Sequence, residues 1–152
     1  MAASCIFCKI IKGEIPSMKV FESDRTFAFL DINPLSYGHA LVIPKFHGAR
    51  LADIPDDSLQ ELLPVAKKIA LASGAENYNI LQNNGKLAHQ VVDHVHGLLS
   101  LVTQSGDVNT DLHEVHMIPK PNEQEGLGIN WPQQSVSKDK LTKLLEELKA
   151  KM

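Results

Sequence analysis

Histidines alternate with apolar residues at two places in the second half of this chain. Asp93 is followed by His94–Val95–His96, and twenty residues after His96 the chain reads His116–Met117–Ile118–Pro119. A period of two is typical of a β-strand, in which residues two apart point to the same face of a sheet. Two imidazoles aimed into one pocket suit a nucleophile and a neighbour that handles protons. The alternative is the polar face of a solvated strand.

An 18-residue segment, 97–114, separates the two stretches. An excursion of this length from a central strand would break its hydrogen-bond ladder. Without it, the chain would read His-Val-His-Val-His-Met-Ile-Pro, with three imidazoles on one face. Two explanations stay open. The segment is either a loop insertion at one edge of the fold or a retained intron that is translated in frame, because 18 residues correspond to 54 nucleotides, a plausible length for a short intron. If Gly97–Leu99 instead continues the strand, Leu98 takes the third position and activity would be impaired.

The length and composition limit the classes of protein to which this chain can belong. At 152 residues, with 43% hydrophobic and 22% charged residues, the chain is sized for one domain with its own core. A net charge of -3 gives no support for a broad nucleic-acid-binding surface. No apolar run approaches the roughly 20 residues of a membrane span, and Met1–Ser4 lacks the pattern of a signal peptide. We therefore expect an intracellular protein, cytoplasmic with the nucleus as a further site, that binds neither nucleic acid nor membrane.

The hydrophobic pattern predicts more strands than helices. Alternating or wholly apolar runs predict strands at 18–22, 25–30, 39–44, 78–82 and 91–96. Helical spacing is present at 5–12, at 55–74 with a kink or a new start at Pro64, and at 137–151. Ser23–Asp24 and Asn83–Gly85 are turn signals between neighbouring runs. Short turns between strands favour an antiparallel α+β sheet, with 39–44 as a central strand.

Further motifs, in order along most of the chain, resemble those of the histidine triad (HIT) nucleotide-binding proteins, whose signature is His-φ-His-φ-His-φ-φ with φ apolar. The motifs are CIFCKII, EIP, AFLDINP, GHALVIPKFH, QNNG and Trp131–Pro132. Together these motifs look like those of the adenosine 5′-monophosphoramidase branch of the family. The resemblance implies a single HIT domain over 1–152, with a five-stranded antiparallel sheet, two main helices and an unusual insertion in the triad strand.

The resemblance also implies an activity. It is the hydrolysis of adenosine 5′-monophosphoramidates, such as AMP-NH2 and AMP–lysine, through a covalent nucleotidyl-histidine and without a catalytic cofactor. Imidazole suits this role because it is an uncharged nucleophile near pH 7. His96 would be the nucleophile, with His94, His116 and His39 completing the catalytic cluster. The alternatives are a dinucleoside polyphosphate hydrolase, and a nucleotide-binding or interaction protein whose triad the insertion has split.

The expected ligand is a purine nucleotide of the AMP type, and its pocket follows from matched positions. Asp31 resembles the carboxylate that accepts hydrogen bonds from both ribose hydroxyls; from its residue type alone, a turn-forming role is equally open. By the same resemblance, Phe7 and Ile32 would be apolar walls for the purine. Asn83 and Gln90 would donate to phosphate oxygens.

Cys5 and Cys8 are the only cysteines of the chain. Taken alone they could be two small buried hydrophobes, and a disulfide across two residues adds little in a reduced compartment. By resemblance to family members with Cys-x-x-Cys, His47 and His94 would complete a Cys₂His₂ set for tetrahedral structural zinc. The resemblance further implies a homodimer that joins two sheets at their edges.

Overall fold

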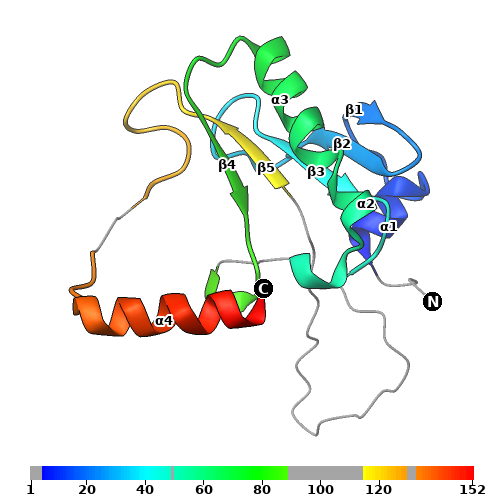
Figure 1. The fold of residues 1–152 in the computed structure, drawn as a ribbon. Helices are drawn as coiled ribbons and strands as arrows, with labels where there is room; N and C mark the ends of the chain where they lie inside the picture. Colours follow the sequence, from blue (N-terminus) through cyan, green and yellow to red (C-terminus); the bar gives the residue numbers. More distant parts are fainter. Residues whose placement is uncertain (1–4, 49, 89–114, 130–132) are drawn as a thin grey trace, which may run out of the picture.

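A five-stranded antiparallel sheet forms the centre of the computed structural model, which describes residues 5–48, 50–88, 115–129 and 133–152 (Figure 1). The strands are β1 (Lys19–Glu22), β2 (Thr26–Leu30), β3 (Ala40–Pro44), β4 (Tyr78–Gln82) and β5 (Val115–Pro119), in the order β1-β2-β3-β5-β4. The helices are α1 (Ile6–Ile11), α2 (Asp56–Leu59), α3 (Leu62–Ser73) and α4 (Lys138–Lys151), with short 3₁₀ turns at Leu51–Asp53 and Lys86–Ala88. The predicted α+β class, five-stranded sheet and two main helices are confirmed.

The predicted runs correspond to strands wherever the structure describes them. The run 39–44 becomes β3, which is the central strand of the sheet. The run 91–96 lies outside the described residues, and β5 begins at Val115. The predicted helix 55–74 is divided into α2 and α3, and α3 starts at Leu62 instead of Pro64. Proline suits this place because the first turn of a helix needs no backbone N–H from it.

The two faces of the sheet are covered by different helices. Ala40 pairs with Met117 and Leu41 pairs with His116, so each pair shares one face. On the first face, α3 packs over a core that includes Ala40 and Met117, both fully buried. On the second, Phe7 of α1 packs on Leu41 and its neighbours in β2 and β3. His116 therefore lies on the α1 face of the sheet.

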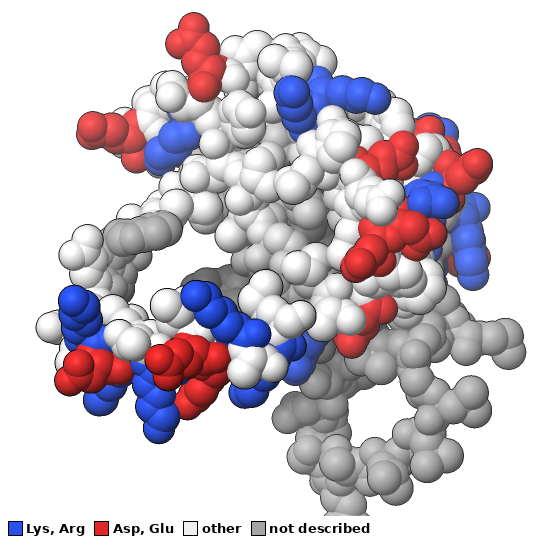
Figure 2. Space-filling model, viewed as in Figure 1, with Lys and Arg blue, Asp and Glu red and all other residues white. Residues whose placement is uncertain are grey.

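The helix α4 is amphipathic and has no buried residue. Its four leucines are each about half exposed, and Lys143 and Glu147 form an ion pair of 4.0 Å on it. On the face shown in Figure 2, lysines and arginines lie among aspartates and glutamates, both on α4 and on the rest of the described chain. Such mixing gives this face no broad field of one sign. Within the described ranges, no helix combines the length and apolarity that a membrane crossing requires.

Candidate active site

His39 and His116 meet across β3 and β5. His39 directly precedes β3, and His116 is the second residue of β5. The distance from His39 Nε2 to His116 Nδ1 is 2.9 Å, and the ring centroids are 5.1 Å apart. His39 is buried, with 3% of its surface exposed, whereas His116 is partly open to solvent. The structure thus brings together two of the four predicted catalytic histidines; His94 and His96 lie outside the described residues.

A backbone amide sets the direction of the hydrogen bond between the two rings. The Leu35 N–H donates to His39 Nδ1 over 3.2 Å, so this nitrogen presents its lone pair. A neutral His39 then carries its proton on Nε2 and donates it to His116 Nδ1. A neutral His116 in turn keeps its own proton on Nε2. His116 is therefore prepared to donate a proton to an anionic ligand or a departing group.

Hydrogen bonds join the loop between β2 and β3 to the end of β5, and they hold the amide of Leu35 in place. The buried Ser36 Oγ donates to the Pro119 carbonyl over 2.6 Å, and the His39 N–H donates to the Ser36 carbonyl over 3.1 Å. Gly38 has φ +86°, and a Cβ built there would contact Pro119 Cγ at 3.4 Å. A side chain at this position would be strained in the left-handed region, which glycine enters freely.

Asp31 lies beside the histidine pair and also forms a turn. Its Oδ1 accepts the Asn33 N–H over 2.8 Å, the geometry of an Asx-turn. Its Oδ2 lies 3.5 Å from His39 Nδ1, and the side chain is 20% exposed. The turn-forming role that its residue type leaves open is therefore present. The second carboxylate oxygen lies close to the histidine pair.

The other predicted nucleotide-binding residues differ in their exposure. Ile32 is 79% exposed and offers an open apolar surface next to Asp31. Phe7 is only 6% exposed, because its ring packs edge-on against Phe29 at 5.5 Å in the core below α1. Asn83 directly follows β4 and is partly buried. Gln90 lies outside the described residues.

Three of the four predicted zinc ligands are gathered at the start of α1. The donor atoms of Cys5, Cys8 and His47 all lie within 4.8 Å of one another. The distance from Cys8 Sγ to His47 Nδ1 is 3.4 Å, and the Cys8 N–H donates to Cys5 Sγ over 3.1 Å. Burial raises the pKa of the Cys8 thiol to about 11, and the neighbouring Cys5 adds to this rise. A bound dication would favour the thiolate instead. His94, the fourth predicted ligand, lies outside the described residues.

Asp31, His39 and His116 form a second group of donor atoms that lie within 4.8 Å of one another. The two imidazoles are hydrogen-bonded to each other, which occupies a lone pair that a metal would need. This group is therefore better suited to passing protons than to holding an ion.

The sequence gives no sign of the part played by Leu35, because it acts through its amide and not its side chain.

Comparisons with known proteins agree with this fold. The HIT domain family matches residues 12–97, which end at the first residue of the inserted segment. The chain is 51% identical over 150 residues to the adenosine 5′-monophosphoramidase HNT1 of Saccharomyces cerevisiae, with 99% of this chain and 84% of that protein covered. It is 48% identical to the adenosine 5′-monophosphoramidase hnt1 of Schizosaccharomyces pombe, with 98% of each chain covered.

Two solved structures extend the comparison. A histidine triad nucleotide-binding protein from Candida albicans has a TM-score of 0.82 and 46% identity, over 97% of this chain and 96% of that one. A zinc-bound histidine triad family protein from Mycobacterium smegmatis has a TM-score of 0.66 and 27% identity, with all of both chains covered. On these matches in sequence and fold, the chain belongs to the HIT family.

Proposed function

We propose that this protein hydrolyses adenosine 5′-monophosphoramidates. The observation that carries the proposal is the bond between His39 and His116, whose direction leaves His116 Nε2 with a proton to give. Asp31 lies next to this pair, where a carboxylate can accept ribose hydroxyls. Relatives that are about half identical over nearly the whole chain are named adenosine 5′-monophosphoramidases, which supports this substrate class.

The proposed reaction has two displacements at phosphorus. In the first, an imidazole nitrogen of His96 attacks the phosphorus atom, and the P–N bond to the amine breaks. The departing nitrogen takes a proton from His116 Nε2, so the products are a nucleotidyl-histidine and a neutral amine. In the second, water attacks the same phosphorus, gives a proton back to His116, and releases AMP with free His96. The role of His96 is taken from its place in the triad motif.

The test of this function is hydrolysis of a fluorogenic tryptamine–AMP conjugate by the full-length chain. We expect turnover that releases AMP and tryptamine in equal amounts. AMP binding without turnover would favour the alternative of a binding protein with a split triad. Faster turnover of diadenosine polyphosphates than of tryptamine–AMP would favour the alternative hydrolase.

Leu35→Pro is expected to lower kcat about tenfold with little change in KM. Proline removes the N–H that donates to His39 Nδ1, so His39 is no longer held in one tautomer. Nitrogen-15 NMR of the imidazoles should then report a mixed tautomer for His39. Leu35→Ala is the matched control, because it keeps the N–H and truncates a side chain that is 51% exposed. Equal kcat values in the two variants would contradict this role.

We further propose that Cys5, Cys8, His47 and His94 hold a structural zinc ion. The gathering of three of these donors within 4.8 Å supports it. Purified protein should contain one zinc per chain, and Cys5→Ser should lose it and melt about 5 °C or more lower, because metal binding contributes directly to folding. His113→Ala, at a histidine with no assigned role, should keep both the metal and the melting temperature. Absence of zinc from the parent protein would contradict the proposal.

We also propose that the chain forms a homodimer through β4 and α3. β4 is an edge strand of the sheet, and Tyr78 and Ile80 on it are 41% and 40% exposed. Leu63 and Leu71 of α3 are 60% and 72% exposed. Pairing of two such edges would bury strand groups that otherwise attract other chains. Light scattering should give twice the chain mass of 16.7 kDa, and a mass of one chain would contradict the dimer.

A further inference from the structure

Ser36 has a buried hydroxyl, and none of the predicted functional sets includes this residue. Ser36 lies in the loop between β2 and β3 and is 5% exposed. Its Oγ donates to the Pro119 carbonyl over 2.6 Å, and the two residues are 83 positions apart in the chain. Burial of a hydroxyl is costly unless the group is hydrogen-bonded. The bond therefore fixes the loop to the last residue of β5.

This bond lies beyond the point where the pairing of β3 with β5 ends. β3 begins at Ala40, whereas β5 continues to Pro119. The Lys120 N–H donates to the Asn77 carbonyl beside β4 over 2.8 Å. In a trans peptide group the C=O points away from the N–H, so the Pro119 carbonyl points towards the side of β3. Ser36 supplies a donor there, where the strand itself no longer provides one.

A tight turn connects Ser36 to His39. The His39 N–H donates to the Ser36 carbonyl over 3.1 Å, which closes a four-residue turn. Its third residue, Gly38, has φ +86°, close to the value that a type II turn requires at this place. The His39 carbonyl accepts the Asp31 N–H over 3.0 Å. Both backbone polar groups of His39 are therefore bonded, and its backbone is held at a set place relative to Ser36.

The hydroxyl bond and the bond between the two imidazoles join the same two segments. Ser36 precedes His39 by three residues, and Pro119 follows His116 by three residues. The rings meet with His39 Nε2 2.9 Å from His116 Nδ1. An N–H···N bond depends steeply on its distance and angle. A shift of the loop relative to β5 would therefore weaken the contact between the rings.

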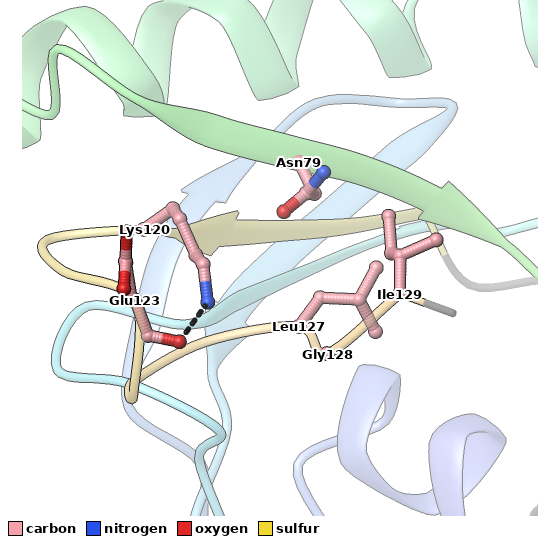
Figure 3. Close-up of a pocket in the computed structure, with 6 residues that line it drawn as sticks. All are labelled: Asn79, Lys120, Glu123, Leu127, Gly128 and Ile129. Atoms are coloured by element: carbon pink, nitrogen blue, oxygen red, sulfur yellow. Dashed lines mark hydrogen bonds between the residues drawn. The ribbon is translucent and has the colours of Figure 1, made fainter. Parts of the chain in front are cut away.

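The chain after β5 folds back against the same Pro119 carbonyl. Lys120 Nζ donates to the Glu123 and Glu125 carbonyls over 3.1 and 2.7 Å, and this segment borders a cavity of about 600 Å³ (Figure 3). Gly126 on the segment has φ +83°, and a Cβ built there would lie 2.6 Å from the Pro119 oxygen. The carbonyl that accepts the hydroxyl is therefore held from a second side.

We propose that Ser36 is a positioning residue for the proton transfer to the departing amine. It acts through the histidine pair, because its hydroxyl bond sets the approach of His39 to His116. As the P–N bond breaks, the departing nitrogen takes the proton of His116 Nε2, and water returns a proton in the second displacement. The inference rests on the proposed phosphoramidase function and adds a residue that the triad motif does not contain.

Ser36→Ala is expected to lower kcat on tryptamine–AMP about tenfold with little change in KM, the effect of a small misplacement of a catalytic group. The 4-nitrophenyl ester of AMP should lose less than about twofold, because 4-nitrophenolate departs without a proton. Ser73→Ala is the matched control and should leave both rates unchanged. The Ser73 hydroxyl also donates to a backbone carbonyl, that of Ala70 over 2.8 Å, but on α3, which covers the other face of the sheet.

Nitrogen-15 NMR of the imidazoles gives a readout that does not depend on activity. The parent protein should show a scalar coupling between His39 Nε2 and His116 Nδ1 through their hydrogen bond. Ser36→Ala should lose this coupling while circular dichroism shows a folded chain. If Ser36→Ala does not fold, Ser36→Cys serves for the same comparison, because it fills the same space with a weaker donor.

An equal loss of kcat on both substrates would overturn the inference, because it would indicate a general structural effect. A coupling that persists in Ser36→Ala would overturn it as well. If the parent protein does not hydrolyse tryptamine–AMP, the proposed function fails, and the coupling then decides by itself whether Ser36 positions the pair.

Discussion

Replacement of His96 by glycine is expected to lower kcat on tryptamine–AMP to less than about one-thousandth of the parent value. Without its nucleophile the protein cannot form the covalent intermediate, and only substrate binding and polarisation of the phosphate would still accelerate the reaction. The affinity for AMP should change by less than about tenfold, because contacts to ribose and base remain. Stopped reactions analysed by mass spectrometry should show a nucleotidyl adduct on the parent protein and none on the variant.

A matched control for this variant is His113→Gly, which makes the same change at a histidine within the inserted segment. It should leave kcat unchanged. Full activity of the His96→Gly protein would exclude His96 as the nucleophile. Loss of AMP affinity together with kcat would indicate that the variant disturbs the pocket itself.

Removal of residues 97–114 is expected to raise kcat by about tenfold to a hundredfold, the range that a small misplacement of a catalytic group costs. β5 starts at Val115, which pairs with Val42 of β3. In the shortened chain His96 would directly precede Val115 and come opposite Ile43. Ile43 shares the face of Leu41 and His116, so the imidazole of His96 would join theirs.

The measurement compares the full chain, the shortened chain and a chain with 18 Gly/Ser residues in place of the segment. The Gly/Ser chain should match the full chain if the segment acts only through its length. A shortened chain without activity, beside an active full chain, would mean that the segment supplies a group the reaction needs. Absence of turnover in all three chains would contradict the proposed enzymatic function. A mature transcript that lacks these 54 nucleotides would identify the segment as an intron, since 18 × 3 = 54.

The apolar runs predict β2 and β3 because both faces of the sheet are covered there, and a strand buried on both faces reads as a continuous apolar run. A shift of one residue in β3 would exchange Leu41 and Val42 between two different cores, which fixes the register of this strand. The start of α3 is less certain from sequence, because Pro64 fits a first turn as well as a break. The packing of Phe7 is not predictable either, because an aromatic residue on a short helix can face a pocket, the core or both; its ring packs edge-on against Phe29.

The sequence does not predict the parts of the site that are formed by backbone groups or by residues that come together only in the folded chain. Leu35 contributes an amide, which every residue except proline has, so no side-chain pattern indicates it. The cavity of about 600 Å³ between β4 and the segment after β5 is lined by Asn79 of β4 and by residues from two parts of that segment, Lys120 with Glu123 and Leu127–Ile129. Its wall depends on the conformation of Gly126, with φ +83°, which the sequence permits and does not dictate.

The peptide groups on either side of Leu35 serve two neighbours at once. Its N–H bonds to His39, and its carbonyl accepts the Gly126 N–H from the wall of the cavity. His39 and the segment after β5 are therefore hydrogen-bonded to the same residue. A substitution that shifts the backbone of Leu35 would displace both neighbours at once, so the orientation of the His39 ring and the position of that segment are structurally coupled.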